Sequence, residues 1–512
     1  MSGGSMREAS ISETLQRRQL QQRLAELNRR SALQAGALSL LGLGLPELLA
    51  ARQSVAQAAV AQAAVTQAAA AQTAVAQAAA AQAASTAKPS DGFGRAKACI
   101  LLFMWGGPAH QDTWDMKPDA PAEVRGEFKP IASRLPSLPI CEHFPQLATR
   151  TDRLCIVRSM THNNADHTPS THFLLTGMPP PPTDNRRLQW PNMGSVLAKL
   201  GRGRGALPTT IAMRPKLEND VPRFVEQSQG TFAGWLGSLY DPMIIDQDPS
   251  RPNYRVDGLQ LSADISAQRL ADRQSLRGEL SRLPLERHSA VRAHDGNIDR
   301  AFQLLTGAAE QRGAFRLEEE SLALRERYGL NPHGQSVLQA RRLVERGVPL
   351  VTVFWPNDGI KNVSVYWDTH SRNFIDLKER LMPVADQAFS ALLDDLRERG
   401  MLDDTLVVWT GEFGRTPRIG QRNSDAGAGR DGRDHWPGCF TSVLAGGGTK
   451  AGFVYGRSDK QAAFPAADPV APHDLVATIY HLLGIPAGLE MLDTGGRPHL
   501  VRPGTAITDL IA

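Results

Sequence analysis

Short polar stretches rich in Asp, Glu and His recur along the later part of this 512-residue chain, and no histidine precedes His110. Carboxylates and imidazoles without nearby cysteines suit ions such as Zn, Mn, Mg, Ca or Fe. We therefore expect one or two divalent ions, and two ions about 3.5–4 Å apart would clamp a displacement at phosphorus or sulfur. The stretches read "GGPAHQDTWD" (106–115), "MTHNNADHTPSTH" (160–172), "PNDGIKNVSVYWDTH" (356–370), "GEFGRTP" (411–417) and "GRDGRDHWPG" (429–438).

Two of these stretches contain residue pairs with a specific chemical use. Asp368 and His370 are two residues apart and could converge on one ion from a single tight loop. Arg415 offers a fork of N–H donors that matches a tetrahedral oxyanion. A structural ion pair between Arg415 and Glu412 explains the arginine equally well.

The elements that must position these loops alternate along the chain. Between continuous hydrophobic runs, which are typical of strands buried on both faces, lie helical patterns at 192–201, 261–328, 335–347, 373–400 and 473–484. This order predicts a mostly parallel sheet with helices on both faces, and chemistry at the carboxyl ends of its strands. Residues 178–260 are rich in Pro and Gly and predict a long excursion or cap. The hydrophobic runs are "ACILLFMW" (98–105), "RLCIVRS" (153–159), "VPLVTVFW" (348–355), "TLVVWT" (405–410) and "FTSVLAGG" (440–447).

Composition narrows the function classes. Hydrophobic residues make up 41% of the chain, enough for a sizeable core, and the net charge of +4 is too small to favour nucleic acid. The four cysteines form no CxxC pair, which disfavours a zinc–thiolate site and leaves open a bridge between Cys141 and Cys155. The chain has no G-x-S-x-G elbow, Walker loop or H-E-x-x-H motif.

The N-terminal region predicts export. Residues 1–50 include Arg29-Arg30 before an interrupted hydrophobic stretch that is too short to span a membrane. It resembles a twin-arginine signal, although a soluble amphipathic helix is the alternative. Residues 51–94 form an Ala/Gln-rich spacer ahead of the main domain at 95–512. We therefore expect the twin-arginine export machinery as a partner, no transmembrane helix in the mature protein, and a location in the periplasm, at the cell surface or outside the cell.

Long motifs between residues 95 and 510 resemble the domain-of-unknown-function 1501 family of exported bacterial proteins. That family is similar to the alkaline phosphatase and sulfatase superfamily, so the resemblance implies an alkaline phosphatase-like three-layer sandwich. The motifs are "LFMWGGPAHQDTWDMKPDAPAEVRGEFKPI" (102–131), "YWDTHSRNF" (366–374), "LVVWTGEFGRTPRI" (406–419) and "GRDHWPGCFTSVLAGGGTKAGFVYG" (432–456).

The nucleophile loop of sulfatases has a modified counterpart here. Sulfatases carry Cys-x-Pro-Ser-Arg, whose cysteine becomes formylglycine, and then Leu-Leu-Thr-Gly. This chain keeps Pro169, Ser170 and "LLTG" (174–177), but has His167 in place of the cysteine and Thr171 in place of the arginine. The resemblance therefore implies an ester hydrolase without formylglycine, in which His167 is a metal ligand. His172 is expected to be a bystander on the following helix.

Two further anchors of the superfamily are altered, which implies a rebuilt metal shell. The superfamily's Asp-His pair reads Glu412-Phe413 here, and its first-strand Asp-Gly reads Gly106-Gly107. The candidate nucleophile is Thr168 or Ser170, or a water activated by the metal, with Arg415 assisting. The candidate metal ligands are Asp112, His110, His167, Asp368, His370, Glu412 and His435.

Two functions from different classes follow. The first is a metal-dependent hydrolase of phosphate or sulfate esters, with sulfated or phosphorylated polysaccharide as a possible partner. The second is a non-catalytic exported protein that binds polysaccharide or cell-surface material, and a mainly structural surface protein explains the polar loops less well. Stacking on sugar rings would use tryptophans near the loops: Trp105, Trp114, Trp355, Trp367, Trp409 and Trp436.

Overall fold

The computed structural model describes residues 92–512, apart from 204–206, 215–224, 226–227, 257–258, 260–265, 282–297, 299–301, 303–304, 306–312 and 358–364. The export signal predicted at 1–50 and nearly all of the spacer at 51–94 lie outside the described residues. Among the residues that are described, no helix is long and apolar enough to cross a membrane.

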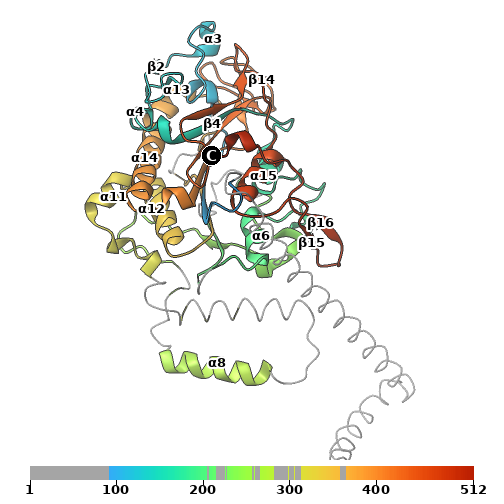
Figure 1. Cartoon of the computed structure of the whole chain (residues 1–512). Helices are drawn as coiled ribbons and strands as arrows, with labels where there is room; N and C mark the ends of the chain where they lie inside the picture. Colours follow the sequence, from blue (N-terminus) through green and yellow to red (C-terminus); the bar gives the residue numbers. More distant parts are fainter. Residues whose placement is uncertain are drawn as a thin grey trace, which may run out of the picture. The chain divides into compact units, whose positions relative to one another are not determined.

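An eight-stranded sheet forms the centre of the protein (Figure 1). All neighbouring strands pair in parallel except at β11, which runs antiparallel to both of its neighbours. From one edge to the other the strands are β12 (Phe453–Tyr455), β4 (Leu154–Met160), β11 (Phe440–Ala445), β8 (Thr405–Thr410), β1 (Ala98–Phe103), β7 (Leu350–Phe354), β5 (Thr210–Met213) and β6 (Met243–Ile245).

The five predicted hydrophobic runs are the central strands β1, β4, β7, β8 and β11. Every residue of β1 is buried, as expected for a strand covered on both faces. In the sheet register Phe103 lies opposite Thr410 of β8 and Phe354 of β7, so three strands end at the same level. Because β11 runs the other way, the loop before it reaches the edge at which its neighbours end.

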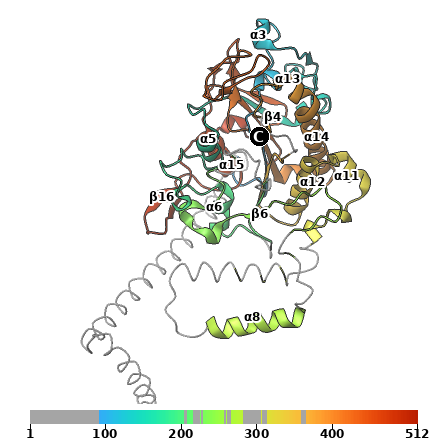
Figure 2. The same cartoon turned by 180° about the vertical axis from the view of Figure 1, so that it is seen from behind.

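Helices cover both faces of the sheet, so the predicted fold class is confirmed. On one side lie α11 (Leu322–Tyr328), α12 (Pro332–Glu345) and α14 (Met382–Glu398), and on the other α5 (His167–Thr176), α6 (Met193–Lys199) and α15 (Pro472–Leu482) (Figures 1 and 2). Asn331 starts α12 by accepting a hydrogen bond from the Gly334 amide at 2.8 Å, as an N-cap residue does.

Residues 178–260, predicted as an excursion or cap, contribute β5 and β6 to the central sheet as well as α6 to its cover. Further described elements are short helices, α8 and two-stranded ladders. They are α3 (Ala122–Arg125), α4 (Pro145–Ala148), α8 (Ala267–Ser281), α13 (Asn373–Asp376) with a π-helical turn at Leu377–Leu381, β2 (Pro130–Ile131) with β3 (Ile140–Cys141), β9 (Gly414–Arg415) with β10 (His435–Trp436), β13 (Arg457–Ser458) with β14 (Pro465–Ala467), and β15 (Glu490–Leu492) with β16 (Pro498–Leu500).

Candidate metal centre

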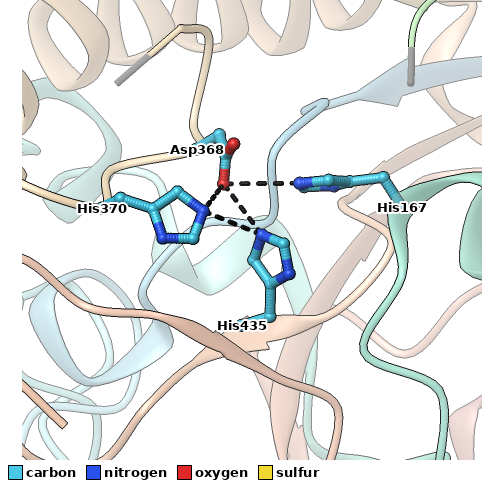
Figure 3. A group of neighbouring side chains, drawn as sticks. All are labelled: His167, Asp368, His370 and His435. Atoms are coloured by element: carbon cyan, nitrogen blue, oxygen red, sulfur yellow. Dashed lines mark hydrogen bonds and ion pairs between the residues drawn. The ribbon is translucent and has the colours of Figure 1, made fainter. Parts of the chain in front are cut away.

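Four side chains from three separate segments converge beyond the carboxyl ends of the strands (Figure 3). His167 begins α5, Asp368 and His370 lie in the segment between β7 and α13, and His435 lies on β10. One potential ligand atom from each of the four lies within 4.8 Å of the others. All four were predicted as metal ligands, and they are the one such group of His, Cys, Asp or Glu found among the described residues.

Local structure fixes where each of these side chains starts. Asp166 caps α5 by accepting a hydrogen bond from the Thr168 amide at 2.9 Å, which places His167 at the first position of the helix. His435 lies directly opposite Arg415 in the β9–β10 ladder. Asp434, the residue before His435, accepts hydrogen bonds from the amides of Asn423 and Ser424 at 2.6 and 2.7 Å and thereby fixes the loop leading to β10.

The three imidazoles present their Nε2 atoms to one carboxylate oxygen. Asp368 Oδ1 lies 3.4 Å from Nε2 of His167, 2.8 Å from that of His370 and 3.1 Å from that of His435. The Nε2 atoms of His370 and His435 are 2.9 Å apart. In a tetrahedral zinc site with bonds of about 2.0–2.1 Å, ligand atoms lie about 3.3 Å from one another. The four distances given above, 2.8–3.4 Å, are close to the spacing that a single ion of this size requires.

The opposite nitrogen of each ring is held by an oxygen. Nδ1 of His370 bonds to the Gly427 carbonyl at 2.5 Å, and Nδ1 of His435 bonds to the Ala165 carbonyl at 2.8 Å. Nδ1 of His167 lies 2.5 Å from Glu412 Oε1. Because a carbonyl or carboxylate oxygen only accepts, each Nδ1 must carry the hydrogen. In a neutral ring the Nε2 lone pair then faces the Asp368 carboxylate, which is unfavourable unless a proton or a metal ion lies between them.

Charge at the centre is dominated by Asp368 and its neighbours. Burial acts to raise the pKa of Asp368, but Arg415 and His167 outweigh it and hold that pKa well below its usual range. Burial acts to lower the pKa of His167, but the charges of Asp368 and Glu412 raise it to about 9. Burial, followed by the charge of His167, lowers the pKa of His435 to about 4. An ion binding here would take the place of the proton on His167.

The centre reaches the surface. The side chains of Asp368 and His370 are 16% and 15% exposed, compared with 7% for His167 and 8% for His435. A small ligand could therefore approach the carboxylate and the His370 ring from solvent.

Glu412, also predicted as a ligand, lies behind His167 rather than within the group of four. It is fully buried, and its Oε1 accepts a hydrogen bond from the Gly106 amide at 2.8 Å in addition to its contact with His167. Its Oε2 is buried and has no hydrogen-bond partner among the described residues. A carboxylate on the far nitrogen of a ligating histidine typically orients the ring and makes it a stronger ligand.

Two other predicted ligands point elsewhere. Asp112 is fully buried and forms a bidentate ion pair with Arg433, with N···O distances of 2.7 and 3.0 Å. It also accepts a hydrogen bond from the side-chain amide of Asn373. His110 Nε2 bonds to the Ala462 carbonyl at 2.9 Å, and burial lowers the pKa of His110 to about 4. Neither belongs to the group of four, because its loop turns its side chain into the protein interior.

Arg415, which was predicted to bind an oxyanion, is fully buried, and its N–H groups donate to other protein atoms. It contacts Asp368 and the Gly106 carbonyl through Nη2, and its Nε donates to the Gly107 carbonyl at 3.0 Å. Its Nη1 donates to the Arg433 carbonyl at 3.1 Å. The partner expected as the structural alternative was Glu412, whereas the observed carboxylate partner is Asp368. Arg415 thus joins the loop after β1 to the metal-centre carboxylate.

The two candidate nucleophiles in the first turn of α5 differ in exposure and in hydrogen bonding. Ser170 is fully buried and its hydroxyl donates to the Asn164 carbonyl at 3.0 Å, whereas Thr168 is partly exposed. His172, expected to be a bystander, is buried with Nδ1 on the Met178 carbonyl and Nε2 accepting from the Trp190 amide. Cys141 and Cys155, along with the other two cysteines, are buried free thiols.

The tryptophans predicted to form a stacking surface are mostly part of the core. Trp105, Trp114, Trp355, Trp367 and Trp409 are at most 2% exposed. Trp436 is partly exposed, and its indole nitrogen donates to the Ala463 carbonyl at 2.6 Å. Five of the six tryptophans therefore pack the loops against the sheet and are not available to a sugar ring.

Sequence reasoning missed the groups that orient the histidines. The Gly427 and Ala165 carbonyls and the clamp at Asp434 depend on how the loops fold, and a backbone carbonyl leaves no signal in residue type. His162, in the same polar stretch as His167, also contacts this region: its Nε2 lies 2.7 Å from the carbonyl of Glu412.

The fold and the centre define a class: an α/β protein with a three-histidine, one-carboxylate centre at the carboxyl ends of a mostly parallel sheet. The chain belongs to the family described as "Protein of unknown function (DUF1501)", whose model matches residues 96–511. No protein with a curated description matches the sequence.

Solved structures with a likeness to this chain share little of its sequence. The lipoteichoic acid synthase LtaP from Listeria monocytogenes is 11% identical, with a TM-score of 0.35 over 82% of this chain and 78% of that one. The PsFucS1 sulfatase from Pseudoalteromonas sp. is 14% identical, with a TM-score of 0.35 over 82% and 72%. A protein in the alkaline phosphatase superfamily from Vibrio parahaemolyticus is 10% identical, with a TM-score of 0.36 over 83% and 72%. At these scores the functional case rests on this chain's own residues.

Proposed function

We propose that His167, Asp368, His370 and His435 bind one divalent metal ion, and that the protein is a metal-dependent hydrolase of phosphate or sulfate esters. The observation that carries the proposal is the orientation of the three imidazoles. Each Nδ1 is held by an oxygen, so each Nε2 is left to face the same carboxylate oxygen. Nitrogen and oxygen donors in this set fit zinc or manganese better than the harder calcium or magnesium.

The bound ion would supply positive charge for the oxyanion of an ester. This chain's own residues orient the centre: Glu412 holds the His167 ring and Arg415 holds the Asp368 carboxylate. Thr168 is the better candidate nucleophile because it is partly exposed and adjacent to His167, whereas the hydroxyl of Ser170 is buried and already donates a hydrogen bond. His167 in the place of the sulfatase cysteine supports chemistry without formylglycine.

Turnover by the full chain tests this function. With Zn or Mn supplied, we expect it to hydrolyse at least one of p-nitrophenyl phosphate, bis(p-nitrophenyl) phosphate and p-nitrophenyl sulfate. His370→Ala should lower kcat/KM about a hundredfold or more, and Thr168→Ala should do the same if Thr168 is the nucleophile. Ser170→Ala is the matched hydroxyl deletion on the same helix, and Glu490→Gln on the exposed face of β15 is the surface control. No turnover of any ester with any divalent ion argues against the hydrolase.

A non-catalytic metal protein that binds polysaccharide is the second candidate, and the completeness of the ligand set favours it. Four protein ligands fill a tetrahedron, whereas catalytic zinc sites usually leave one position open. A chain that retains metal, binds sulfated polysaccharide saturably and releases no product would support this function over hydrolysis.

Export through the twin-arginine route remains part of the proposal and rests on Arg29-Arg30. We expect the full chain to appear outside the cytoplasm and an Arg29→Lys/Arg30→Lys variant to stay inside. Equal export of both proteins would show that this pair is not the signal.

A further inference from the structure

Arg214 is a buried cation at the end of β5, two strands away from β1. Its amide donates to the Ile245 carbonyl at 2.9 Å, which extends the β5–β6 pairing by one residue. Its side chain is only 7% exposed and lies over the Trp105 ring, with Cζ 5.8 Å from the ring centroid. The guanidinium contacts the Val225 carbonyl through Nη2.

The charge of Arg214 has no carboxylate partner in the part of the chain that the structure describes. Its Nε is buried without a hydrogen-bond partner there. Burial, and then the like charge of Arg186, lowers the pKa of Arg214 to about 10. A buried charge without a counter-charge is costly and is rarely kept unless something compensates it.

Arg214 lines a cavity of about 260 Å³ at the same sheet edge as the metal centre. The cavity is floored by Met213, Ile245 and Phe354, which are the last residues of β5, β6 and β7. Its volume is just below the range of pockets that take small organic ligands. Carboxyl ends of parallel strands are the usual ligand-binding edge of such sheets.

A second cationic feature faces this cavity. Pro332 and Ser336, from the first turns of the 14-residue helix α12, line it, and the N-terminal end of a helix attracts negative charge. The helix end and the buried Arg214 therefore favour the same kind of ligand group, an oxyanion.

Two carboxylates that also line the cavity, Asp246 and Asp248, restrict what else the ligand carries. Asp248 is engaged by the Ser250 amide and hydroxyl at 2.9 and 2.7 Å and by Arg251 at 3.1 Å. Asp246, which also lines the cavity, accepts a hydrogen bond from Gln247 through one oxygen, and a carboxylate has further acceptor positions. A bare anion would leave Asp246 facing a like charge, whereas a ligand with hydroxyl groups would donate to it.

We propose that this cavity binds a small polyhydroxylated oxyanion, such as a sugar bearing a carboxylate, phosphate or sulfate, with the anionic group on Arg214 and the α12 N-terminus. The site stands apart from the metal centre and does not require that the protein hydrolyse esters.

Binding of defined sugars to the metal-loaded full chain tests the site. Glucuronate, glucose 6-phosphate and glucose 6-sulfate separate the possible anions, and glucose is the neutral control. We expect at least one charged sugar to bind saturably by calorimetry and to raise the unfolding temperature, and glucose to do neither. Saturable binding of none of the charged sugars overturns the proposal.

Variants of Arg214 assign the binding to this cavity. Arg214→Met should weaken it at least about tenfold while leaving the free protein as stable as wild type or more so, because it removes a buried charge that has no carboxylate partner among the described residues. Arg214→Lys keeps the charge and should retain weaker binding, which provides the readout if the Met variant fails to fold. Arg502→Met is the matched control, because Arg502 is equally buried, has an unpartnered Nε among the described residues and does not line the cavity. Unchanged binding in both Arg214 variants would place the ligand elsewhere, for example on the metal, and would contradict the proposal.

Discussion

Among single residues, Glu412 is the one expected to have the largest indirect effect on the proposed metal centre, because its carboxylate contacts His167. It is fully buried, accepts from the Gly106 amide and holds Nδ1 of His167. If His167 binds a metal, this charge would strengthen it as a ligand and keep the ring in one orientation.

Glu412→Gln should lower metal affinity about 10- to 100-fold with the fold intact, because the amide keeps the shape of the side chain but loses its charge. Competition with a chelator of known affinity measures this change, and Glu490→Gln on the surface is the control. Equal affinity in Glu412→Gln and wild type would show that Glu412 does not act on a metal.

A second prediction about a single residue distinguishes Asp112, which we expect to be structural, from the proposed metal ligands. Since Asp112 neutralises the fully buried Arg433, Asp112→Asn should destabilise the protein by about 3–5 kcal/mol while the folded protein keeps its metal. Chemical denaturation and metal analysis of the same sample measure both quantities. Glu398→Gln, which breaks an exposed pair with Arg327, should cost less than about 1 kcal/mol. Metal loss without loss of stability would instead make Asp112 a ligand.

At the scale of elements, the centre depends on how closely the loop after β1 approaches the loop after β7. Gly106 and Gly107 both have positive φ, 105° and 78°, which glycine adopts without the steric cost of a side chain. A Cβ at Gly106 would collide with the backbone of Trp367 and Asp368. The glycine thus allows the loop that carries Asp368 to lie directly against the end of β1.

Gly106→Ala should therefore cost at least about 2 kcal/mol of stability and reduce metal content, because the Asp368 loop must move. Gly488→Ala is the matched control: its φ is 80° and nothing lies within 4 Å of the added Cβ. Denaturation midpoints and metal content of the two variants separate the cost of a positive φ in alanine from the cost of the steric clash between the added Cβ and the Asp368 loop. Equal losses in both would mean that the contact with the Asp368 loop has no role.

The elements also explain how much the sequence could predict. Continuous hydrophobic runs predicted all five central strands, and the carboxyl-end rule predicted that His167, Asp368, His370 and His435 would meet at one edge. The short strands β5 and β6 were missed because they lie within a Pro- and Gly-rich segment without a long hydrophobic run. Asp112, His110 and Glu412 occupy the right loops, but the direction of a side chain within a loop depends on tertiary contacts such as Arg433 and the Ala462 carbonyl.

At the scale of the whole molecule, buried neutral histidines link stability to pH. His333 packs against Trp355, with ring centroids 4.2 Å apart and the rings tilted by 32°, and burial lowers the pKa of His333 to about 3. The unfolded chain binds this proton near pH 6.5 and the folded chain does not, so stability is lost as pH falls below 6.5. His110, His162 and His172, each with a pKa lowered to about 4 by burial, act in the same direction.

His333→Phe keeps a ring on Trp355 and removes one of these titrations. Between pH 7 and pH 5 its stability should fall by about 2 kcal/mol less than that of wild type. Urea denaturation at both pH values measures the difference. Parallel losses in the two proteins would mean that His333 accepts a proton in the folded state.

Metal content of the protein purified without added metal tests the central claim most directly. We predict about one Zn or Mn ion per chain by elemental analysis, a lower unfolding temperature in chelator, and loss of the ion in an Asp368→Ala/His370→Ala variant but not in Glu490→Gln. A wild-type protein that contains no metal, and whose unfolding temperature responds neither to chelator nor to added Zn or Mn, would contradict the account.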